Sequence, residues 1–312
     1  MNRRRAPTDL PASVRDRLRG LARKRGVEFQ LLLSEFAIER LLYRLGVSAY
    51  AERFVLKGAT LFKLWSAVQR RATWDLDLLG HGASGVDDVV AVIGDLCRIE
   101  AADGIVFDVG TVVGEEMRVP DEYAGVRVRL QAHLATARVP VQVDVGFGDA
   151  VVPAPRREVY PALLDHPPPE VLVYPREAVV AEKLEAVVSL GVTTSRMKDL
   201  FDLHRLAAEI SFDGQRLARA VRATFERRGT PFPEGPPVVL TADFLTGAER
   251  TTQWRAFLRR SRLEGPQDVV ALADELRAFL LPVIEAAAQE HPLNDAWAAG
   301  GPWVHLGEKA ES

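Results

Sequence analysis

Cysteine is almost absent from this sequence. Cys97 is the single cysteine in 312 residues, which excludes an internal disulfide framework and fits a reducing compartment. The six histidines lack the spacing of a zinc site. No uninterrupted apolar run approaches the about 20 residues of a membrane span, and the basic start of the chain leads into a polar stretch instead of a signal-peptide core. We therefore expect a cytoplasmic protein without a membrane partner.

An excess of one charge is also missing. The net charge is −3, so any nucleic-acid surface must be a local patch and not a property of the whole chain. We find no internal repeat and no low-complexity tract. The length and the apolar share of 47% allow a sizeable core and one or two domains.

Two aspartates form the most informative pattern. Residues 75–79 predict a strand in which Asp75 and Asp77 alternate with leucines, so both carboxylates share one face. Like charges at this spacing repel one another unless a cation lies between them, and Mg²⁺ prefers oxygen ligands. The pair therefore suggests a metal site, although a solvated carboxylate pair on an exposed strand face is the commoner arrangement.

A tight turn ahead of this strand suggests the other half of a phosphate site. An apolar strand over residues 54–56 leads into the turn, and a helix follows it. Gly58 lets the backbone approach a ligand, and free N–H groups at the start of the helix favour an anion. The turn consists of Lys57, Gly58, Ala59 and Thr60. Together with the two carboxylates, it suggests binding of a nucleoside triphosphate and a metal ion.

A third aspartate lies on another predicted strand. Over residues 139–147, alternate valines form an apolar face and leave Gln142 and Asp144 on the opposite face. Asp144 is thus able to meet Asp75 and Asp77 across neighbouring strands, where the three carboxylates could hold two metal ions. The alternative is a polar residue that points outward from an edge strand.

A lysine in the second half of the chain needs a counter-charge. Lys183 lies within the apolar arc of a predicted helix. Asp199 and Asp202 lie three positions apart on the helix predicted for residues 196–208, and they are candidate partners. A structural ion-pair network and a cation that reaches triphosphate oxygens both fit this pattern.

The remaining chain predicts an arrangement in lobes. Residues 11–45 are expected to be helical, with Ser13 as a helix cap, and Ser48 is expected to cap a short helix over residues 48–54. The arginines of this region are expected to lie on a solvated face. Further strands are expected over residues 105–113 and 125–134. The expected parts are an N-terminal helical segment (1–50), a core (51–150), a Pro-rich irregular connection (151–175), a helical C-terminal lobe (176–290) and a poorly packed tail (291–312).

Arginines recur along the C-terminal helices. They could form a patch that follows an RNA backbone, although arginine-rich exposed helices are common in other proteins. The arginines are Arg216, Arg219, Arg222, Arg227, Arg228, Arg250, Arg255, Arg259, Arg260 and Arg262.

Together these motifs resemble the AbiEii/AbiGii nucleotidyltransferase toxins, a family that includes the mycobacterial MenT toxins. The resemblance covers residues 50–210 and rests on the order and spacing of its parts. These parts are Lys57-Gly58-Ala59-Thr60, Thr73-x-Asp75-x-Asp77, Val143-Asp144-Val145, Pro175-Arg176-Glu177 with Glu182-Lys183-Leu184, and Arg196-x-Lys198-Asp199-x-x-Asp202-Leu203.

The resemblance implies a fold and an activity. The implied fold is α+β, with a DNA polymerase β-like nucleotidyltransferase core, built from a mixed sheet with flanking helices, and a helical C-terminal lobe. The implied enzyme uses Mg²⁺ or Mn²⁺ to transfer a nucleoside monophosphate from an NTP to an acceptor. In relatives the acceptor can be the 3′ end of tRNA, and extension of this end inhibits translation. The resemblance also implies the toxin half of a type IV toxin–antitoxin or abortive-infection system, with a winged-helix AbiEi-type antitoxin as its partner.

The resemblance also assigns roles to residues. The implied catalytic residues are Asp75, Asp77, Lys183 and Asp199. Asp75 and Asp77 match the metal-binding pair of the family, and Asp144 is the third metal ligand that the strand pattern predicts. The implied nucleotide-binding residues are Lys57, Gly58, Ala59, Thr60, Thr73, Asp144 and Asp202. Ala59 stands where the family usually has a second glycine, and Phe201 stands where it has a tyrosine.

Two alternatives stay open. The acceptor could be a hydroxyl group of a protein or of a small molecule. The chain could also be a catalytically idle nucleotide-binding protein that acts only through its partner.

Overall fold

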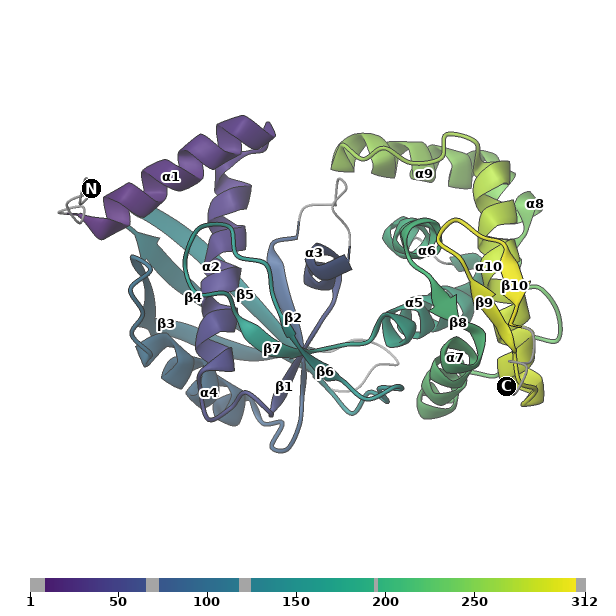
Figure 1. Ribbon diagram of the computed structural model, residues 1–312, viewed down its shortest axis with the longest axis horizontal. Helices are drawn as coiled ribbons and strands as arrows, with labels where there is room; N and C mark the ends of the chain where they lie inside the picture. Colours follow the sequence, from purple (N-terminus) through teal and green to yellow (C-terminus); the bar gives the residue numbers. More distant parts are fainter. Residues whose placement is uncertain (1–8, 66–72, 118–124, 194–195, 307–312) are drawn as a thin grey trace, which may run out of the picture. The chain divides into compact units, whose positions relative to one another are not determined.

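The computed structural model describes residues 9–65, 73–117, 125–193 and 196–306, which fall into two compact units (Figure 1). Unit 1 comprises residues 1–64, 72–148 and 156–173 and contains a large sheet. Unit 2 comprises residues 65–71, 149–155 and 174–312 and is mainly helical. No helix in the described ranges combines the length with the apolar character that crossing a bilayer requires.

The helices of unit 1 largely follow the predicted pattern. They are α1 (Leu10–Arg25), α2 (Phe29–Gly46) and α4 (Val86–Arg98), with the 3₁₀ turn Ala59–Leu61 and the short α3 (Phe62–Trp65) after the first strand. Gly26 ends α1 in a left-handed conformation, as its position between two apolar patterns suggested. Both expected serine caps are wrong. Asp9 caps α1 by accepting a hydrogen bond from the Ala12 N–H, and turns follow Ser48 in place of a helix.

The described strands of unit 1 form a seven-stranded mixed sheet with the order β3-β4-β5-β2-β1-β7-β6 (Figure 1). The strands are β1 (Phe54–Lys57), β2 (Asp75–Gly80), β3 (Ile105–Met117), β4 (Gly125–Leu134), β5 (Ala137–Phe147), β6 (Arg156–Val159) and β7 (Glu170–Val173). The β2–β5 and β1–β7 pairs are parallel, and the other neighbouring pairs are antiparallel. The α+β class with a mixed sheet and flanking helices is thereby confirmed.

The segment expected to be an irregular connection contains two of these strands. Short β6 and β7 lie between its prolines and extend the sheet beyond β1. Prolines are tolerated next to short strands at a sheet edge, so the proline content of this segment was misleading.

One face of the sheet is apolar. Leu56, Leu78, Val145 and Val126 are successive register partners on β1, β2, β5 and β4, and all four are buried. Helix α2 packs against β5 and β7, and α4 packs against β3 and β4. Because the side chains of a strand alternate, the neighbouring residues of these four strands point to the opposite face, which carries the candidate site.

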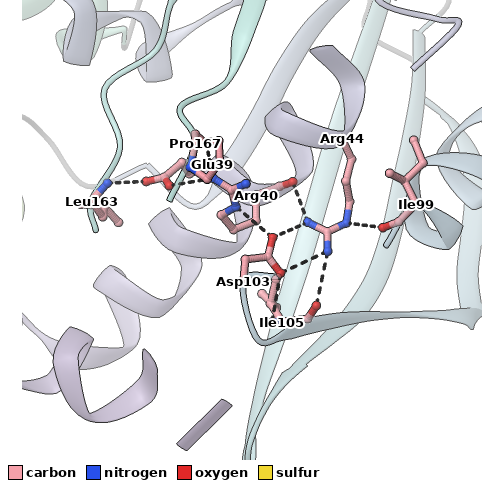
Figure 2. Close-up of polar contacts among 8 residues, drawn as sticks. All are labelled: Glu39, Arg40, Arg44, Ile99, Asp103, Ile105, Leu163 and Pro167. Atoms are coloured by element: carbon pink, nitrogen blue, oxygen red, sulfur yellow. Dashed lines mark hydrogen bonds and ion pairs between the residues drawn. The ribbon is translucent and has the colours of Figure 1, made fainter. Parts of the chain in front are cut away.

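A buried ionic cluster fixes α2 to the rest of unit 1 (Figure 2). It consists of Glu39, Arg40, Arg44 and Asp103, all of them buried. The Asp103 carboxylate accepts hydrogen bonds from Arg40 Nε at 2.9 Å and from Arg44 Nη1 at 2.8 Å. The expectation that the N-terminal arginines lie on a solvated face is therefore wrong for Arg40 and Arg44.

Unit 2 is a helical bundle with a small sheet. Its helices are α5 (Arg176–Leu190), α6 (Met197–Glu209), α7 (Gly214–Arg228), α8 (Ala242–Thr246), α9 (Ala248–Ser261) and α10 (Val269–Gln289). The strands are β8 (Phe212–Asp213), β9 (Asp295–Trp297) and β10 (Trp303–His305), and the 3₁₀ turns are Gly191–Thr193 and Val238–Leu240.

The segment after α10 is packed against this bundle. Strand β9 pairs with β8 and β10, and the buried Trp297 donates a hydrogen bond from its indole N–H to the Ala207 carbonyl at 2.7 Å. The expectation of a poorly packed tail is wrong for Trp297 and Trp303, because these two tryptophans anchor the segment on Phe279, whereas Val304 and Leu306 are exposed.

Candidate active site

The polar face of the unit 1 sheet carries charged side chains on neighbouring strands. Asp77 on β2 is the register partner of Lys57 on β1 and of Asp144 on β5, and Asp144 is in turn the partner of Arg127 on β4. Register partners lie on the same face of a sheet. We call these four residues, Lys57, Asp77, Asp144 and Arg127, the charged row. Asp75 lies on the same face one strand repeat before Asp77.

Within the charged row, Arg127 binds Asp144 through two hydrogen bonds. Its Nε donates to Oδ1 at 2.8 Å and its Nη2 to Oδ2 at 2.7 Å, and Gln142 adds a longer bond to Oδ2 at 3.2 Å. The hydrogen bond to Asp144 raises the pKa of Arg127 against the opposing effect of burial, and the charges of Asp144, Asp75 and Glu115 add to this increase. Asp144 lies on β5, between β4 and β2, so the alternative that it points outward from an edge strand is wrong.

The predicted turn forms a cradle for Asp77. Gly58 has a φ of +75°, and a Cβ atom at this position would lie 1.9 Å from Asp77 Oδ2. Glycine is therefore required both for the backbone conformation and for the space that the Asp77 carboxylate occupies. Two bonds brace the turn: Leu61 N–H donates to the Gly58 carbonyl at 3.3 Å, and the Thr60 hydroxyl donates to the Asp75 carbonyl at 3.5 Å.

Thr73 places an unsatisfied polar atom next to β2. Its hydroxyl oxygen is buried and has no hydrogen-bond partner among the described residues. A buried hydroxyl without a partner is costly, and a bound ligand is one way to satisfy it. Thr73 precedes Asp75 by two residues, so this atom belongs to the same part of the chain as the carboxylate pair.

The donor chemistry of the polar face fits a hard divalent cation. Asp75 and Asp77 offer carboxylate oxygens on one face, the ligand type that Mg²⁺ prefers. Among the described residues, however, no three His, Cys, Asp or Glu side chains are gathered as a ready metal-binding group. Asp144 lies beside Asp77 in the sheet but is bound by Arg127, so the three-aspartate metal site stays a prediction.

Unit 2 brings together the other predicted charges. Lys183 on α5 contacts Asp199 at 2.9 Å and Asp202 at 2.7 Å, both on α6, and Arg196 lies 3.7 Å from Asp199. We call Lys183, Asp199 and Asp202 the lysine cluster. Burial alone would lower the pKa of Lys183, but the charges of Asp202 and Asp199 outweigh it and raise this pKa. Burial would likewise raise the pKa of Asp199, but Lys183 outweighs it and lowers this pKa.

The C-terminal arginines are not equivalent. Arg228 contacts Glu185 at 2.7 Å, and Arg222 contacts Glu226 at 2.6 Å and Glu290 at 2.7 Å. These two arginines are neutralised by acids and do not fit the expected phosphate patch. On α9, by contrast, exposed arginines form no ion pair with any described residue. They are Arg255, Arg259 and Arg260.

Comparison with known proteins gives a decisive match. The family model for the AbiEii nucleotidyl transferase toxin of type IV toxin–antitoxin systems matches residues 40–288. The chain belongs to the AbiEii family. This match confirms the resemblance seen in the motifs, and it includes the charged row, the lysine cluster and nearly all of the helices of unit 2.

Solved structures give weaker likenesses. JHP933 from Helicobacter pylori is 17% identical, with a TM-score of 0.48, over 85% of this chain and 94% of its own. A second Helicobacter pylori structure, described as a candidate nucleotidyltransferase, is 17% identical, with a TM-score of 0.45, over 85% of this chain and 97% of its own. Neither carries an argument beyond the AbiEii match. No curated protein matches the chain.

Membership of the AbiEii family identifies the chain as a nucleotidyltransferase toxin of a toxin–antitoxin system. It implies an NTP substrate and an antitoxin partner. The charged row and Asp75 lie in unit 1, and the lysine cluster lies in unit 2.

Sequence reasoning missed the contact between Arg127 and Asp144. Arg127 alternates with apolar residues along the strand predicted for residues 125–134, which places it on the polar face but identifies no partner for it. A signal existed, because β4 and β5 are joined by the two-residue turn Ala135-Thr136. A hairpin of this length fixes the register, and this register places Arg127 opposite Asp144.

Proposed function

We propose that this AbiEii chain transfers a nucleoside monophosphate from an NTP to an RNA hydroxyl, with the 3′ end of tRNA as the acceptor, and thereby inhibits translation in the cytoplasm. The observation that carries the proposal is the face shared by Asp75, Asp77 and Asp144 on adjacent parallel strands. We further propose an AbiEi-type winged-helix antitoxin as its partner and abortive infection as its setting.

The reaction forms one bond and breaks one bond at the α-phosphorus. The acceptor oxygen bonds to this phosphorus, the bond to the bridging oxygen breaks, and pyrophosphate leaves with its electron pair. Asp75 and Asp77 would hold Mg²⁺ or Mn²⁺. A bound divalent ion supplies charge neutralisation on the triphosphate. Asp144 would orient the acceptor hydroxyl and accept its proton.

The other predicted residues have supporting roles. Lys183 would neutralise phosphate charge, since its amine stays protonated, and Asp199 and Asp202 would orient it. The Thr73 hydroxyl would find its missing partner on the nucleotide. The turn of Lys57, Gly58, Ala59 and Thr60 would bind the triphosphate and keep the Asp77 carboxylate in place.

Helix α9 supports an RNA acceptor over a small molecule. Arg255 and Arg259 lie four residues apart on its exposed side, and Arg260 follows. Arginines without acidic partners are available to phosphate groups, whereas Arg222 and Arg228 are occupied. A small-molecule acceptor does not offer the successive phosphate groups that such a surface can bind.

The proposal is tested by incubating the purified protein with Mg²⁺, total tRNA and each α-labelled NTP in turn. We expect label in tRNA with the wild type and none with Asp77→Asn. Asp88→Asn, which alters an exposed acid on α4, should transfer like the wild type.

The destination of the label separates the alternatives. Label on a protein or a small molecule would replace RNA as the acceptor and keep the chemistry. An absence of transfer to any acceptor, with nucleotide binding intact, would favour the catalytically idle protein and overturn the proposal.

A further inference from the structure

The contact between Arg127 and Asp144 sets a condition on the proposed reaction. Both oxygens of Asp144 accept a hydrogen bond from the same guanidinium group. With the bond from Gln142, three of the about four lone-pair sites of this carboxylate are occupied and its charge is offset, so it is a weaker metal ligand and proton acceptor than an unpaired carboxylate. Asp144 is therefore engaged in this structure, although it lies beside Asp77 in the sheet.

The surroundings of Arg127 allow the contact to exchange. The Arg127 side chain is 32% exposed, whereas that of Asp144 is 14% exposed. No other hydrogen bond to a described residue fixes the guanidinium group, and Glu115, the register partner of Arg127 on β3, is bound by Arg129 at 2.8 Å. Arg127 can leave Asp144 and enter water, and a cation that takes its place keeps the largely buried Asp144 carboxylate paired, so the cost of release is moderate.

Electrostatics gives Arg127 a second effect. The negative charge of Asp75, like that of Asp144, raises the pKa of Arg127, although the register partner of Asp75 on β5 is Gln142 and not Asp144. A cation close to these carboxylates satisfies part of their mutual repulsion and also repels an incoming divalent ion. Arg127 and a metal ion are thus competitors for the same negative charge.

We propose that Arg127 is a displaceable counter-ion, which binds Asp144 in the resting protein and is replaced there when a divalent cation binds the carboxylates. This inference rests on the proposed function, because it concerns the regulation of the same site. Arg127 offsets part of the negative charge of the carboxylate face without a metal, and its release couples metal binding to the freeing of Asp144.

Binding of Mn²⁺ to the nucleotide-free protein tests this competition without any turnover. Free Mn²⁺ is counted by electron paramagnetic resonance during a titration of the full chain. We expect Arg127→Gln to bind Mn²⁺ about tenfold more tightly than the wild type, because the competing charge is gone. Arg127→Lys should lie between the two, because a lysine keeps the charge but loses the paired hydrogen bonds.

Arg129→Gln is the matched control. Arg129 lies on the same strand and the same face, two residues from Arg127, and it contacts Glu115 instead of an aspartate of the site. Its Mn²⁺ affinity should stay within about twofold of the wild type. Arg127→Gln with wild-type or weaker affinity would overturn the inference.

An Asp77→Asn titration separates the inference from the proposed function. Loss of Mn²⁺ binding in Asp77→Asn, with no gain in Arg127→Gln, would leave the metal site standing and remove only the counter-ion. Wild-type Mn²⁺ binding by Asp77→Asn would overturn both. If Arg127→Gln does not fold, as judged by circular dichroism, Arg127→Lys tests the inference in its place. We expect the Mn²⁺ affinity of Arg127→Lys to exceed that of the wild type by about threefold.

Discussion

Two arginine–aspartate contacts in unit 1 have the same chemistry and opposite surroundings. Arg44 binds both oxygens of Asp103, at 2.8 and 3.3 Å, and Arg127 binds both oxygens of Asp144, at 2.8 and 2.7 Å. The side chains of the first pair are 3% and 1% exposed, whereas those of the second are 32% and 14% exposed. Accessibility, and not hydrogen-bond geometry, distinguishes a structural pair from one that a ligand can displace.

The remaining contacts of each arginine reinforce this difference. Arg44 also donates to the carbonyl groups of Ile99, Arg40 and Ile105, so its guanidinium group is satisfied on all sides (Figure 2). The hydrogen bonds of the Arg127 guanidinium group to described residues go to Asp144. Removing a partner should therefore cost stability in the first pair and alter ligand binding in the second.

The largest effect on stability is expected from Asp103→Asn. This change removes the carboxylate that Arg40 and Arg44 share and leaves Glu39, 3.5 Å from Arg40, as the remaining acid of the cluster, so it should lower the free energy of unfolding by about 3–5 kcal/mol. Urea denaturation followed by circular dichroism measures it. Asp16→Asn, which removes a partner from the exposed Asp16–Arg19 pair, should cost less than about 1 kcal/mol. Equal losses in the two variants would remove the contrast on which the comparison depends.

The lysine cluster extends the comparison, because it is buried like the Asp103 cluster and Lys183 is nevertheless proposed to act on the phosphates. Lys183→Met should destabilise the protein by about 3 kcal/mol, since it leaves Asp199 and Asp202 without their shared cation. Thermal unfolding must accompany every activity assay of this variant. A fully stable Lys183→Met protein without transfer activity would assign Lys183 to catalysis alone.

The pH dependence of the lysine cluster follows from Asp199. Lys183 lowers the pKa of Asp199 below its ordinary value of 3.8, so this carboxylate stabilises the fold above pH 3.8. The contribution is lost as the pH falls through the lower, folded-state pKa. Asp199→Asn should therefore be less stable than the wild type at pH 7, and the difference should shrink below pH 3.8. A constant difference over this range would show that the carboxylate charge has no role.

Gly58→Ala should affect both stability and activity. The positive φ costs about 1–2 kcal/mol in a residue with a side chain, and the new Cβ would displace the Asp77 carboxylate. We expect nucleotide transfer to fall by about tenfold or more. Gly82→Ala is the control, because Gly82 has a φ of +85° but no atom within 4 Å of the added Cβ. It should lose similar stability and keep its activity; a loss of transfer in both would point to strain alone.

The smallest effect on stability is expected at α9. The double variant Arg255→Gln with Arg259→Gln should change stability by less than about 0.5 kcal/mol. If these residues contact phosphates, the slope of log tRNA affinity against log salt should fall by about 1–2. Arg277→Gln, which alters an exposed arginine that is paired with Asp274, should leave the slope unchanged. An unchanged slope in the double variant would exclude α9 from RNA binding.

The elements of unit 1 could be predicted well, because their apolar periodicity is local. The alternation of Asp75 and Asp77 with leucines fixed the face of β2, and the valines of β5 fixed that of Asp144. The order of strands in the sheet brings these faces together, and no local pattern states this order. Strands β6 and β7 were missed because four-residue strands between prolines carry little periodic signal.

Buried charges were the least predictable part. Arg40 and Arg44 lie in a helix that is apolar on nearly all sides, which is the signature of a buried helix, and their burial follows from this. Their partner Asp103 lies 59 residues beyond Arg44, so only the folded chain identifies it. The ion pairs of Lys183 could be predicted, because its candidate partners Asp199 and Asp202 lie within 20 residues of it, three positions apart on the next helix.

The most direct test of the account maps where the metal binds. Fe²⁺ replaces Mg²⁺ in the presence of a non-hydrolysable NTP, and ascorbate with hydrogen peroxide then generates hydroxyl radicals that cut the backbone near the ion. The account predicts cuts in β2 and β5, near Asp77 and Asp144, identified by mass spectrometry and lost in Asp77→Asn. Cuts confined to unit 2, or cuts in β2 and β5 that persist in Asp77→Asn, would contradict it.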